Sequence, residues 1–430
     1  MGAIKLMSLL RYKYKIRVGK VATARLLKEW DAVRHIWNYL TALSREPGFR
    51  FDGSALGKQV TQYSKDNPWL REYSGGIRSD TYRKWAELYV KHLSSLKKGK
   101  AAKIGRLRFK SKDKDAPSLS YRAGNYSLKS DPVTEKDVLY LAKARKSTYS
   151  EPIRCNVVWS RPLPDGPKTC TIYRDSVGDW FASFVVEVED QPLEETGNYC
   201  GIDWGSQKIA TVYDYRLQAE GSSAEKSDLT KANEVNMGKV SRKLSRAKRG
   251  SNNYKRIKKT RAKLYRHMAN SRKNSAVLWS REITSKYDYI CSEDFKVKKL
   301  TQLAAEGKGP RRKKKAIARQ YSDNAVSLYK ATLEDLGKRR GREVISVPAS
   351  YTTRICSNCL KVNDKIPLSQ RVFQCSKCGH TDGRDLNASK NMLRIGMDTS
   401  EKDIEIRTGF NPAVVEASSA ASHSVMSCAD

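Results

Sequence analysis

The stretch Cys356–Asn391, CSNCLKVNDKIPLSQRVFQCSKCGHTDGRDLNASKN, decides how the C-terminal part of the chain folds. It contains two Cys-x2-Cys pairs with fifteen residues between them, a spacing typical of structural zinc sites. Gly379 directly follows the second pair and leaves that turn free to adopt a positive φ. Because four thiolates form a closed tetrahedral site, we expect one structural zinc ion, with the ligands Cys356, Cys359, Cys375 and Cys378.

The chain as a whole is strongly basic. Its 430 residues include 83 Lys and Arg against 46 Asp and Glu, a formal net charge of +37. A positive electrostatic field of this size favours nucleic acid as a binding partner. The plainer alternative is a basic protein that binds many acidic partners non-specifically. No apolar run approaches the ~20 residues that span a bilayer, and the N-terminus lacks the apolar segment of a signal peptide. We therefore expect no membrane partner and a cytoplasmic location, or a nuclear one in a eukaryote.

Hydrophobic periodicity divides the N-terminal half into two regions. Residues 22–46, and a second segment with Ser79 as its N-cap, repeat large apolar side chains at three-to-four-residue steps, which predicts amphipathic helices. From about residue 105 to 195, short alternating segments predict a β-barrel or sandwich. One pair of strands there is expected to turn at Gly178 and Asp179.

Strands and helices alternate after Gly201. Apolar strands are expected around residues 199–214, at Tyr289–Cys291 and at 342–351, and a helix from about Ala316 to Leu336 is closed by Gly337.

Two basic helical segments, 238–250 and 252–287, follow a polar loop. The second carries a thin apolar seam formed by Tyr254, Ile257, Leu264, Met268 and Leu278.

Three short segments place a carboxylate on or beside hydrophobic structure, where its burial is costly without a cation. Asp203 lies within a strand, Glu293 and Asp294 end another, and Asp385 opens a helix. Carboxylates gathered from distant strand ends in a basic protein suggest a two-metal site that acts on phosphodiesters. Taken singly, Asp203 is equally a turn residue, Glu293 a solvated strand-end charge and Asp385 a helix N-cap.

One nuclease family carries the same residues in the same order. The segments are Gly201-Ile202-Asp203-x-Gly205, then Glu293-Asp294-Phe295-x-Val297-x-x-Leu300, then Tyr351-Thr352-Thr353-x-x-Cys356-Ser357-x-Cys359 through Arg384-Asp385-x-Asn387-Ala388. Over roughly residues 196–397 the chain resembles the insertion-sequence-encoded TnpB proteins and the related compact type V CRISPR effectors. Trp204, Phe295 and Leu360 depart from the family's usual residues, and none of these departures removes a ligand.

The resemblance implies a multidomain α+β protein. A helical recognition lobe and a β-barrel wedge domain are followed by an RNase H-like (RuvC) α/β domain that contains an inserted four-cysteine zinc ribbon. In the N-terminal half, the wedge domain is expected at residues 1–21 and 105–195 and the helical recognition domain at 22–104. The RuvC nuclease domain, with its first two motifs and the basic helices, is expected at 196–350, and its third motif at 381–397. The ribbon, as a target-binding insert, is expected at 351–380, and a disordered tail at 398–430.

The activity implied by the resemblance is that of a Mg²⁺-dependent, RNA-guided DNA endonuclease. Such a protein binds a guide RNA (an omega RNA or crRNA-like molecule) and double-stranded DNA with a short target-adjacent motif, and one RuvC site with two Mg²⁺ ions cuts both strands. In this chain Asp203, Glu293 and Asp385 match the catalytic magnesium ligands. Supporting roles fall to Asp294, Arg384 and Asn387. The implied location is the prokaryotic cytoplasm, in association with the nucleoid.

An RNA–DNA heteroduplex held through its backbone needs a positively charged channel. The candidates for nucleic-acid contacts are Arg242, Lys243, Arg246, Lys248, Arg249, Lys255, Arg256, Lys258, Lys259, Arg311, Arg312 and Lys313. Two other functions fit the same residues. A DNA transposase could use the same acidic triad, although the N-terminal helices show no clear helix-turn-helix. An RNA-guided DNA-binding repressor without cleavage would be marked by loss of one of the three acids, and all three are present.

Overall fold

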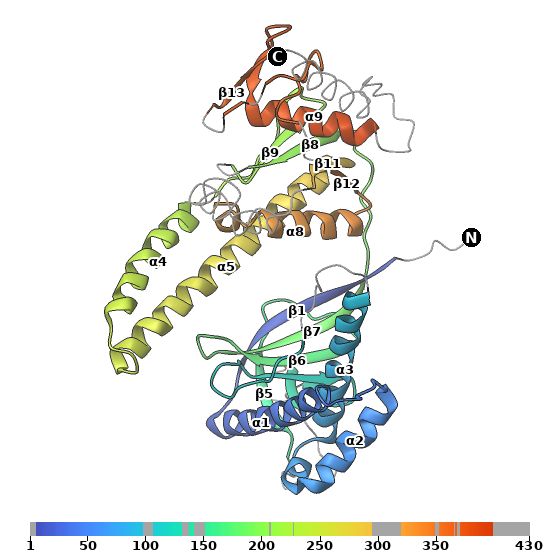
Figure 1. The fold of residues 1–430 in the computed structure, drawn as a ribbon, viewed down its shortest axis with the longest axis vertical. Coiled ribbons are helices and arrows are strands. Elements are labelled where there is room, and N and C mark those ends of the chain that lie inside the picture. Colours follow the sequence, from blue (N-terminus) through green and yellow to red (C-terminus); the bar gives the residue numbers. More distant parts are fainter. Residues whose placement is uncertain are drawn as a thin grey trace, which may run out of the picture. The chain divides into compact units, whose positions relative to one another are not determined.

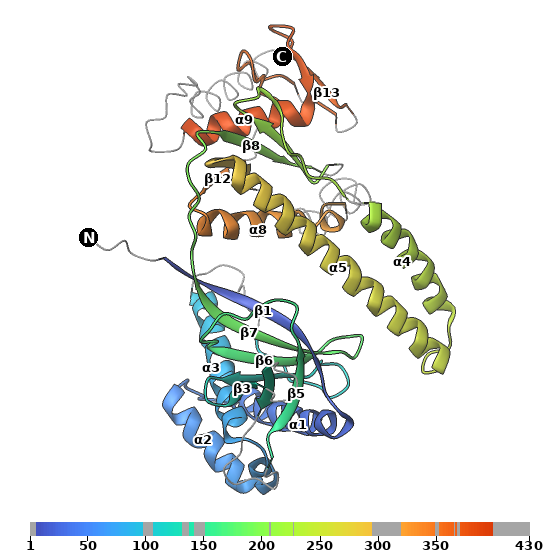
Figure 2. The same ribbon diagram turned by 180° about the vertical axis from the view of Figure 1, so that it is seen from behind.

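The computed structural model describes residues 6–97, 106–130, 137–141, 151–205, 208–226, 228–294, 320–348, 352–364, 366–367 and 370–398. The chain divides into two compact units, Met1–Glu189 and Asp190–Asp430 (Figures 1 and 2). Within the described ranges, no helix combines the length and apolar character needed to cross a membrane. The expected disordered tail, beyond its first residue, lies outside the described residues.

A seven-stranded antiparallel sheet forms the centre of the first unit. Its spatial order is β2 (Ser118–Arg122), β6 (Thr169–Arg174), β7 (Trp180–Glu189), β1 (Met7–Arg17), β5 (Ile153–Val158), β4 (Asp137–Leu141) and β3 (Tyr126–Ser130). Inward-facing residues alternate along the strands, as the buried Trp180, Ala182, Phe184 and Val186 of β7 show. The N-terminal strand β1 pairs with both β7 and β5, so it lies inside a sheet whose other strands come from residues 118–189.

The predicted hairpin turn between β6 and β7 is confirmed. The Asp175 carboxylate accepts hydrogen bonds from the backbone N–H groups of Val177, Gly178 and Asp179 at 3.0, 3.0 and 2.9 Å. Gly178 has a φ of +100°, a conformation that a residue with a Cβ atom rarely adopts. The turn residues therefore specify this reversal locally.

The helices of the first unit are α1 (Lys20–Leu43), α2 (Gly53–Asp66), η1 (Pro68–Glu72) and α3 (Gly75–Lys97). The predicted N-cap at Ser79 is wrong, because α3 begins at Gly75. Ser79 lies in the second turn, where its hydroxyl donates to the Gly76 carbonyl at 3.1 Å. Helix α2 was not anticipated; its N-cap is Asp52, whose carboxylate accepts from the N–H groups of Ser54 and Ala55.

A buried carboxylate links α1 to the sheet. Glu29 is 1% exposed, and its Oε2 accepts a hydrogen bond of 2.8 Å from the hydroxyl of Tyr121 on β2. Burial raises the pKa of Glu29 to about 7, against the lowering effects of Tyr121 and Arg25. The folded protein therefore holds a proton on Glu29 over a pH range where the unfolded chain has released it.

We predict that Glu29→Gln removes a pH dependence from the stability of the first unit. In the unmodified protein the free energy of unfolding should fall by roughly 3 kcal/mol as pH rises from about 4.5 to about 7, and then level off. Gln retains an acceptor for Tyr121 but does not titrate. The free energy of unfolding of the variant should therefore rise relative to that of the parent as pH increases across this range. Urea denaturation followed by tryptophan fluorescence measures the difference. Glu87→Gln, at an exposed position, is the control; parallel curves for parent and Glu29→Gln would contradict the assignment.

The second unit contains a five-stranded sheet. Its order is β10 (Ala219–Glu220), β9 (Ala210–Asp214), β8 (Tyr199–Trp204), β11 (Tyr289–Glu293) and β12 (Glu343–Val347). The first three strands are antiparallel to one another, whereas β8, β11 and β12 are parallel. Parallel neighbours require crossovers, and these are made by helices: α4 (Asp228–Arg246) and α5 (Asn252–Lys286) precede β11, and α8 (Val326–Arg339) precedes β12.

Helices cover both faces of this sheet. Residues of α5 and α8, such as Ile283 and Leu333, share one buried cluster with Ile202 of β8. Helix α9 (Arg384–Asp398) covers the other face, where Leu393 packs in a cluster with Cys291 of β11 (Figure 1). The sheet is therefore the middle of three layers, which explains why β8, β9 and β11 are apolar on both sides.

The expected helix at 316–336 has different bounds. Residues 316–319 lie outside the described residues; a helical turn at 320–323 is followed by a break, where Ala325 has a φ of +56°, and α8 then continues to Arg339. Gly337 lies inside α8 and is not its C-terminal stop. A Cβ atom there would lie 2.6 Å from Cγ2 of Val344, so this glycine permits close packing of α8 on β12. The chain leaves the helix at Gly341, with a φ of +69°.

Helices α4 and α5 form a long antiparallel hairpin that extends away from the sheet, called here the basic arm (Figures 1 and 2). Helix α4 begins at Asp228, ten residues before the segment predicted to be helical. The predicted apolar seam of α5 is largely wrong: of its five residues only Met268 is buried, and Leu278 is 55% exposed. Burial falls instead on Ala276, Trp279 and Ile283, where α5 reaches the sheet.

Candidate active site and metal centre

The strands β8 and β11 present an acid at the same end of the sheet. They are parallel neighbours in which Ile202 lies opposite Ser292. The next residue in each strand is Asp203 and Glu293, and since residues in register point to the same face, these two side chains come together.

Helix α9 brings the third acid to this face. The helix packs so closely on β8 that a Cβ atom on Gly201 would lie 1.9 Å from the carbonyl oxygen of Ser389. Asp203 follows Gly201 by two residues and therefore faces the same helix. Asp385 lies one helical turn before Ser389, in the first turn of α9. Close helix–strand packing through Gly201 thus directs Asp203 and Asp385 towards each other.

A second glycine fixes the other end of the same helix. A Cβ atom on Gly396 would lie 2.4 Å from Sγ of Cys291, so α9 also packs tightly on β11. Glu293 follows Cys291 by two residues and shares its face. The three acids are therefore held by two strands and one helix whose spacing is set by glycines, which gives the site a rigid frame.

The charges of the three acids act on one another. Asp203 is 8% exposed; its burial, and then the charges of Glu293 and Asp385, raise its pKa well above the usual range, while Arg384 opposes the shift. Burial also raises the pKa of Glu293 to about 7, with Lys330 acting in the opposite direction. Carboxylates that are this unfavourable as free anions are suited to binding a cation.

Two residues that the sequence analysis missed lie beside the acids. The Tyr321 hydroxyl donates to the Trp204 carbonyl at 3.3 Å, and burial, then the charges of Asp203, Glu293 and Asp385, raise the Tyr321 pKa. Lys330 of α8 donates from Nζ to the backbone carbonyl of Glu293 at 3.0 Å. Neither residue has a motif around it, and Lys330 is one of 83 basic residues, so sequence alone offered no signal.

The four cysteines form the predicted cluster. Sγ of Cys356 lies 3.7 Å from Sγ of Cys378, and Sγ of Cys359 lies 3.5 Å from Sγ of Cys375. A zinc–sulfur bond of about 2.3 Å places tetrahedral sulfurs about 3.8 Å apart, so these thiols fit one tetrahedral ion. Burial raises the pKa of Cys375, but backbone hydrogen bonds from Cys378 and Lys377 outweigh it and lower the pKa to about 6, which favours the thiolate that binds metal.

The two cysteine knuckles share one backbone feature. The residue after each pair has a positive φ: +70° at Gly379, as the sequence analysis predicted, and +62° at Leu360. Leucine rarely adopts this conformation, and Leu360 stands where the resembled family often has Gly. The first knuckle is therefore locally strained, which metal binding can compensate.

Comparisons with known proteins find similar sequences. The model described as "Probable transposase" (OrfB_IS605) matches residues 183–304, and the "Cas12f1-like, TNB domain" model matches residues 329–392. A protein of Streptomyces pristinaespiralis named "Putative RNA-guided DNA endonuclease" is 27% identical over 393 residues, with 90% of each chain covered. One of Escherichia coli K12, "Putative RNA-guided DNA endonuclease InsQ", is 25% identical over 396 residues, covering 90% of this chain and 92% of its own. The chain is thus similar to the TnpB proteins.

A solved structure shares the fold of this chain. The protein in the "Cryo-EM structure of the Cas12f1-sgRNA-target DNA complex" superposes with a TM-score of 0.59 at 15% identity, covering 87% of this chain and 83% of that one. At this identity the likeness concerns the fold, which is of mixed α/β type with a cysteine cluster, as expected.

The three residues expected to support the acids have distinct surroundings. Asn387 is fully buried; its Oδ1 accepts from the Ser357 N–H at 2.9 Å and its Nδ2 donates to the Ile355 carbonyl at 2.8 Å. It thus fastens α9 to the first cysteine knuckle. Nη1 of Arg384 donates to the Pro367 carbonyl at 3.1 Å. Oδ1 of Asp294 lies 3.4 Å from Nζ of Lys330.

The basic arm contains most of the residues that are candidates for nucleic-acid contacts. The nine candidates from Arg242 to Lys259 are all exposed, and none forms an ion pair with an acid in the described ranges. The acid Glu234 lies nearer the sheet, where it pairs with Lys226 and Arg272. The remaining candidates, Arg311, Arg312 and Lys313, lie outside the described residues.

Proposed function

We propose that the chain is an RNA-guided DNA endonuclease that cuts both strands of its target at one RuvC-type centre. The observation that carries this proposal is the convergence of Asp203, Glu293 and Asp385 on one face of parallel strands beneath α9. Two relatives whose alignments cover 90% of this chain are named for this activity. The order of β8, β9, β10, β11 and β12 supports an RNase H-like fold for the nuclease domain.

In this proposal the three carboxylates would hold two Mg²⁺ ions, and the bound ions would supply Lewis-acid chemistry at the phosphodiester. The chain's own residues fix the acids. Lys330 holds the Glu293 backbone from α8, and Gly201 sets the distance between β8 and α9. Arg371, with Nη1 3.9 Å from Oδ2 of Asp385, would supply positive charge beside the phosphodiester.

The proposed domain roles follow the expected boundaries. Residues 1–21 and 105–195 form the wedge domain and 22–104 the recognition domain, which together hold guide RNA and the target-adjacent motif. Residues 196–350 and 381–397 form the nuclease domain. The ribbon, 351–380, holds one structural zinc ion and contacts the target, and Asn387 transmits its position to α9.

The basic arm is proposed to hold the nucleic-acid backbone. We predict that a triple Arg246→Gln, Lys248→Gln, Arg249→Gln variant binds the guide–target duplex more weakly and less salt-dependently. The slope of log K against log salt should fall by about one for each phosphate that no longer has a cationic partner. Filter binding across a salt series measures it. The charge-preserving pair Arg246→Lys, Arg249→Lys should keep the parent slope; a triple variant with the parent slope would remove these side chains from the interface.

The decisive experiment for function uses the protein together with its own genomic flanking sequence. The RNA that co-purifies is sequenced, and plasmid libraries that carry its complement beside randomised flanks are offered with Mg²⁺. We expect cleavage only of complementary targets that carry one short adjacent motif. Cleavage that is independent of RNA, or the absence of bound RNA, would contradict the proposal.

The second candidate is a DNA transposase with the same acids, favoured by the description of the model that matches residues 183–304. A transposase joins DNA ends to a new site. Strand-transfer products in the same reaction, without a requirement for RNA, would support it over the endonuclease.

A further inference from the structure

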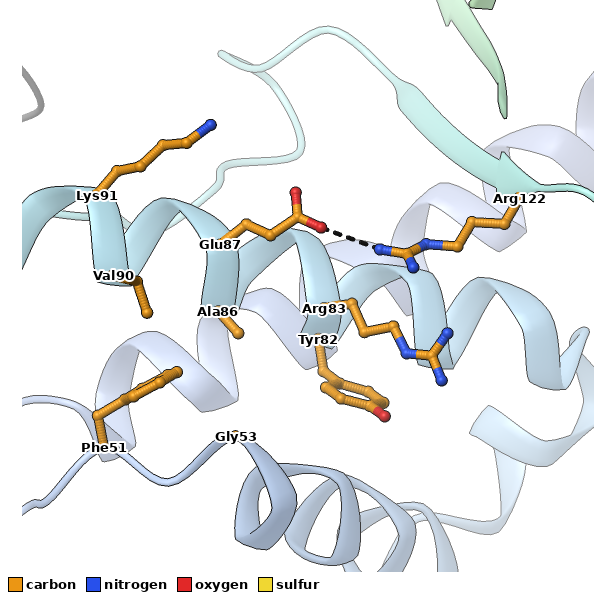
Figure 3. A pocket seen from close by; sticks show the side chains of 9 residues that line it. All are labelled: Phe51, Gly53, Tyr82, Arg83, Ala86, Glu87, Val90, Lys91 and Arg122. Atoms are coloured by element: carbon orange, nitrogen blue, oxygen red, sulfur yellow. Dashed lines mark hydrogen bonds and ion pairs between the residues drawn. The ribbon is translucent and has the colours of Figure 1, made fainter. Parts of the chain in front are cut away.

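A pocket in the first unit lies apart from the proposed nuclease residues in the sequence. It is an open surface pocket with a volume of about 590 Å³, lined by the start of α2, one face of α3 and the end of β2 (Figure 3). Small-ligand sites span roughly 300–1,000 Å³, so this one has room for a single nucleotide.

Two aromatic rings bound the apolar part of this pocket. Phe51 and Tyr82 lie on either side of the space beneath α3, and the small residues Gly53 and Ala86 lie between them, below and above (Figure 3). Both rings are partly exposed, although their neighbours Trp85 and Leu56 are fully buried in the helical core. Partly exposed rings that flank a narrow space are the platform on which unpaired bases stack.

Cations lie at the rim of the same space. Arg83 and Lys91 are exposed on α3, and Arg122 reaches in from β2 (Figure 3). Arg122 is held in place: its Nε lies 3.4 Å from Oδ1 of the buried Asp80, and its Nη2 donates to Oε1 of Glu87 at 3.0 Å. A guanidinium fixed in this way is preorganised for a polar group at the edge of a ring.

The helix end beside the pocket does not supply an anion site. The N–H groups of Ser54 and Ala55 at the start of α2 already donate to the Asp52 carboxylate at 2.8 and 3.2 Å. A phosphate at this rim would therefore be held by side chains, of which Arg83 and Lys91 are the exposed cations.

We propose that this pocket holds one unstacked nucleotide of a single-stranded nucleic acid. The base lies between Phe51 and Tyr82, with its edge towards the Arg122–Glu87 pair, and the phosphate lies at Arg83, beside Tyr82 (Figure 3). The assignment of a nucleic acid rests on the proposed function, and on the charge of the chain, +37. RNA and DNA strands present the same ring and phosphate chemistry, and the test below separates them.

The test is photocrosslinking with the full-length chain in EDTA, so that no cleavage is needed. The probes are a ten-nucleotide oligouridylate with one 5-iodouridine and its deoxy counterpart, and peptide mapping locates the crosslink. We expect it at Phe51 or Tyr82. The probe that reacts, RNA or DNA, identifies the strand that the pocket receives.

A pocket-filling variant gives the sharpest comparison. Gly53 has no positive φ, and a Cβ atom there would meet nothing nearer than Cζ of Phe51 at 4.0 Å, so Gly53→Leu fills the space without disturbing the core. We expect it to reduce the crosslink about tenfold. The control is Gly19→Leu, at a site where an added Cβ meets nothing within 4 Å, and it should crosslink like the parent.

Stacking is separated from charge by a second measurement. Tyr82→Leu should weaken oligonucleotide binding by about fivefold to a hundredfold without changing the salt dependence, because base–aromatic stacking is lost and phosphate contacts remain. No crosslink at either ring with either probe, or an undiminished crosslink in Gly53→Leu, would overturn the proposal. A chain that crosslinks here but never cuts DNA would contradict the proposed function alone.

Discussion

An Asp203→Asn variant is expected to bind guide RNA and target DNA like the parent and to cut the target at least about a thousandfold more slowly. The metal ions of a two-metal site contribute several kcal/mol of transition-state stabilisation, and a factor of ten corresponds to about 1.4 kcal/mol. Asp203 is buried and feels the charges of Glu293 and Asp385, so the substitution would remove one of the three proposed ligands of the ions.

The same substitution has a second effect that a general loss of structure would not produce. Burial and the neighbouring acids raise the pKa of Asp203, which means that its charge is unfavourable in the folded protein without metal. Asn has nearly the same shape and no charge, so the metal-free variant should melt at the parent temperature or above it. Mg²⁺ should raise the melting temperature of the parent more than that of the variant.

The matched control is Asp335→Asn, an exposed acid of α8 that pairs with Arg339. It should cut at the parent rate and respond to Mg²⁺ as the parent does. An Asp203→Asn protein that still cuts, or that melts well below the parent without Mg²⁺, would show that Asp203 has a structural role instead of a catalytic one.

A Cys375→Ser variant is expected to lose its metal and the ordered ribbon. Structural zinc contributes roughly 10 kcal/mol or more to the folding of small zinc modules, and the apolar core of this ribbon is small, with Phe373 and the cysteines at its centre. Because Ser357 and Ile355 hold Asn387, disorder in the ribbon should spread to the start of α9 and to Asp385.

Three measurements follow this loss. Zinc content by elemental analysis should fall from one ion per chain towards zero, hydrogen exchange should rise in residues 384–390, and cleavage should fall. Cys428→Ser, which changes a cysteine outside the four, should retain the ion. Full zinc content in Cys375→Ser would remove that residue from the ligand set.

Local patterns were the most predictable part of this protein. The Cys-x2-Cys spacing confines four thiols to two tight knuckles, and the structure brings their sulfurs within 4.8 Å. The turn at Gly178 was equally local, since one side chain, Asp175, organises it. The strand that ends at Glu293 was visible as an apolar run followed by acids.

Tertiary packing accounts for the errors. Gly337 has the composition of a helix stop, yet its role is to let α8 approach Val344, a contact that sequence does not display. Ser79 has the chemistry of an N-cap, but the preceding turn is helical because Ile77 packs into the core. On α5 the side chains that pack on the sheet are those of Ala276, Trp279 and Ile283, whereas Leu278 lies on the exposed side of the same helical turns, so periodicity overestimated its burial.

The acidic site was predictable only in part. Its three acids are separated by 90 and 92 residues, and their proximity depends on the parallel register of β8 with β11 and on the contact of Gly201 with α9. Family resemblance supplied that arrangement. Lys330 and Tyr321 depend on how α8 and the turn before it meet the strand ends, for which no sequence pattern exists. The catalytic roles and the contacts of the basic arm stay predictions.

The central claim is that one centre, built from three carboxylates, cuts both DNA strands under RNA guidance. Strand-resolved cleavage tests it most directly: a matched target labelled differently on each strand is incubated with the RNA-bound protein and Mg²⁺. The parent should cut both strands, and Asp203→Asn, Glu293→Gln and Asp385→Asn should each cut neither. A variant among the three that still cuts one strand at the parent rate would contradict the single centre.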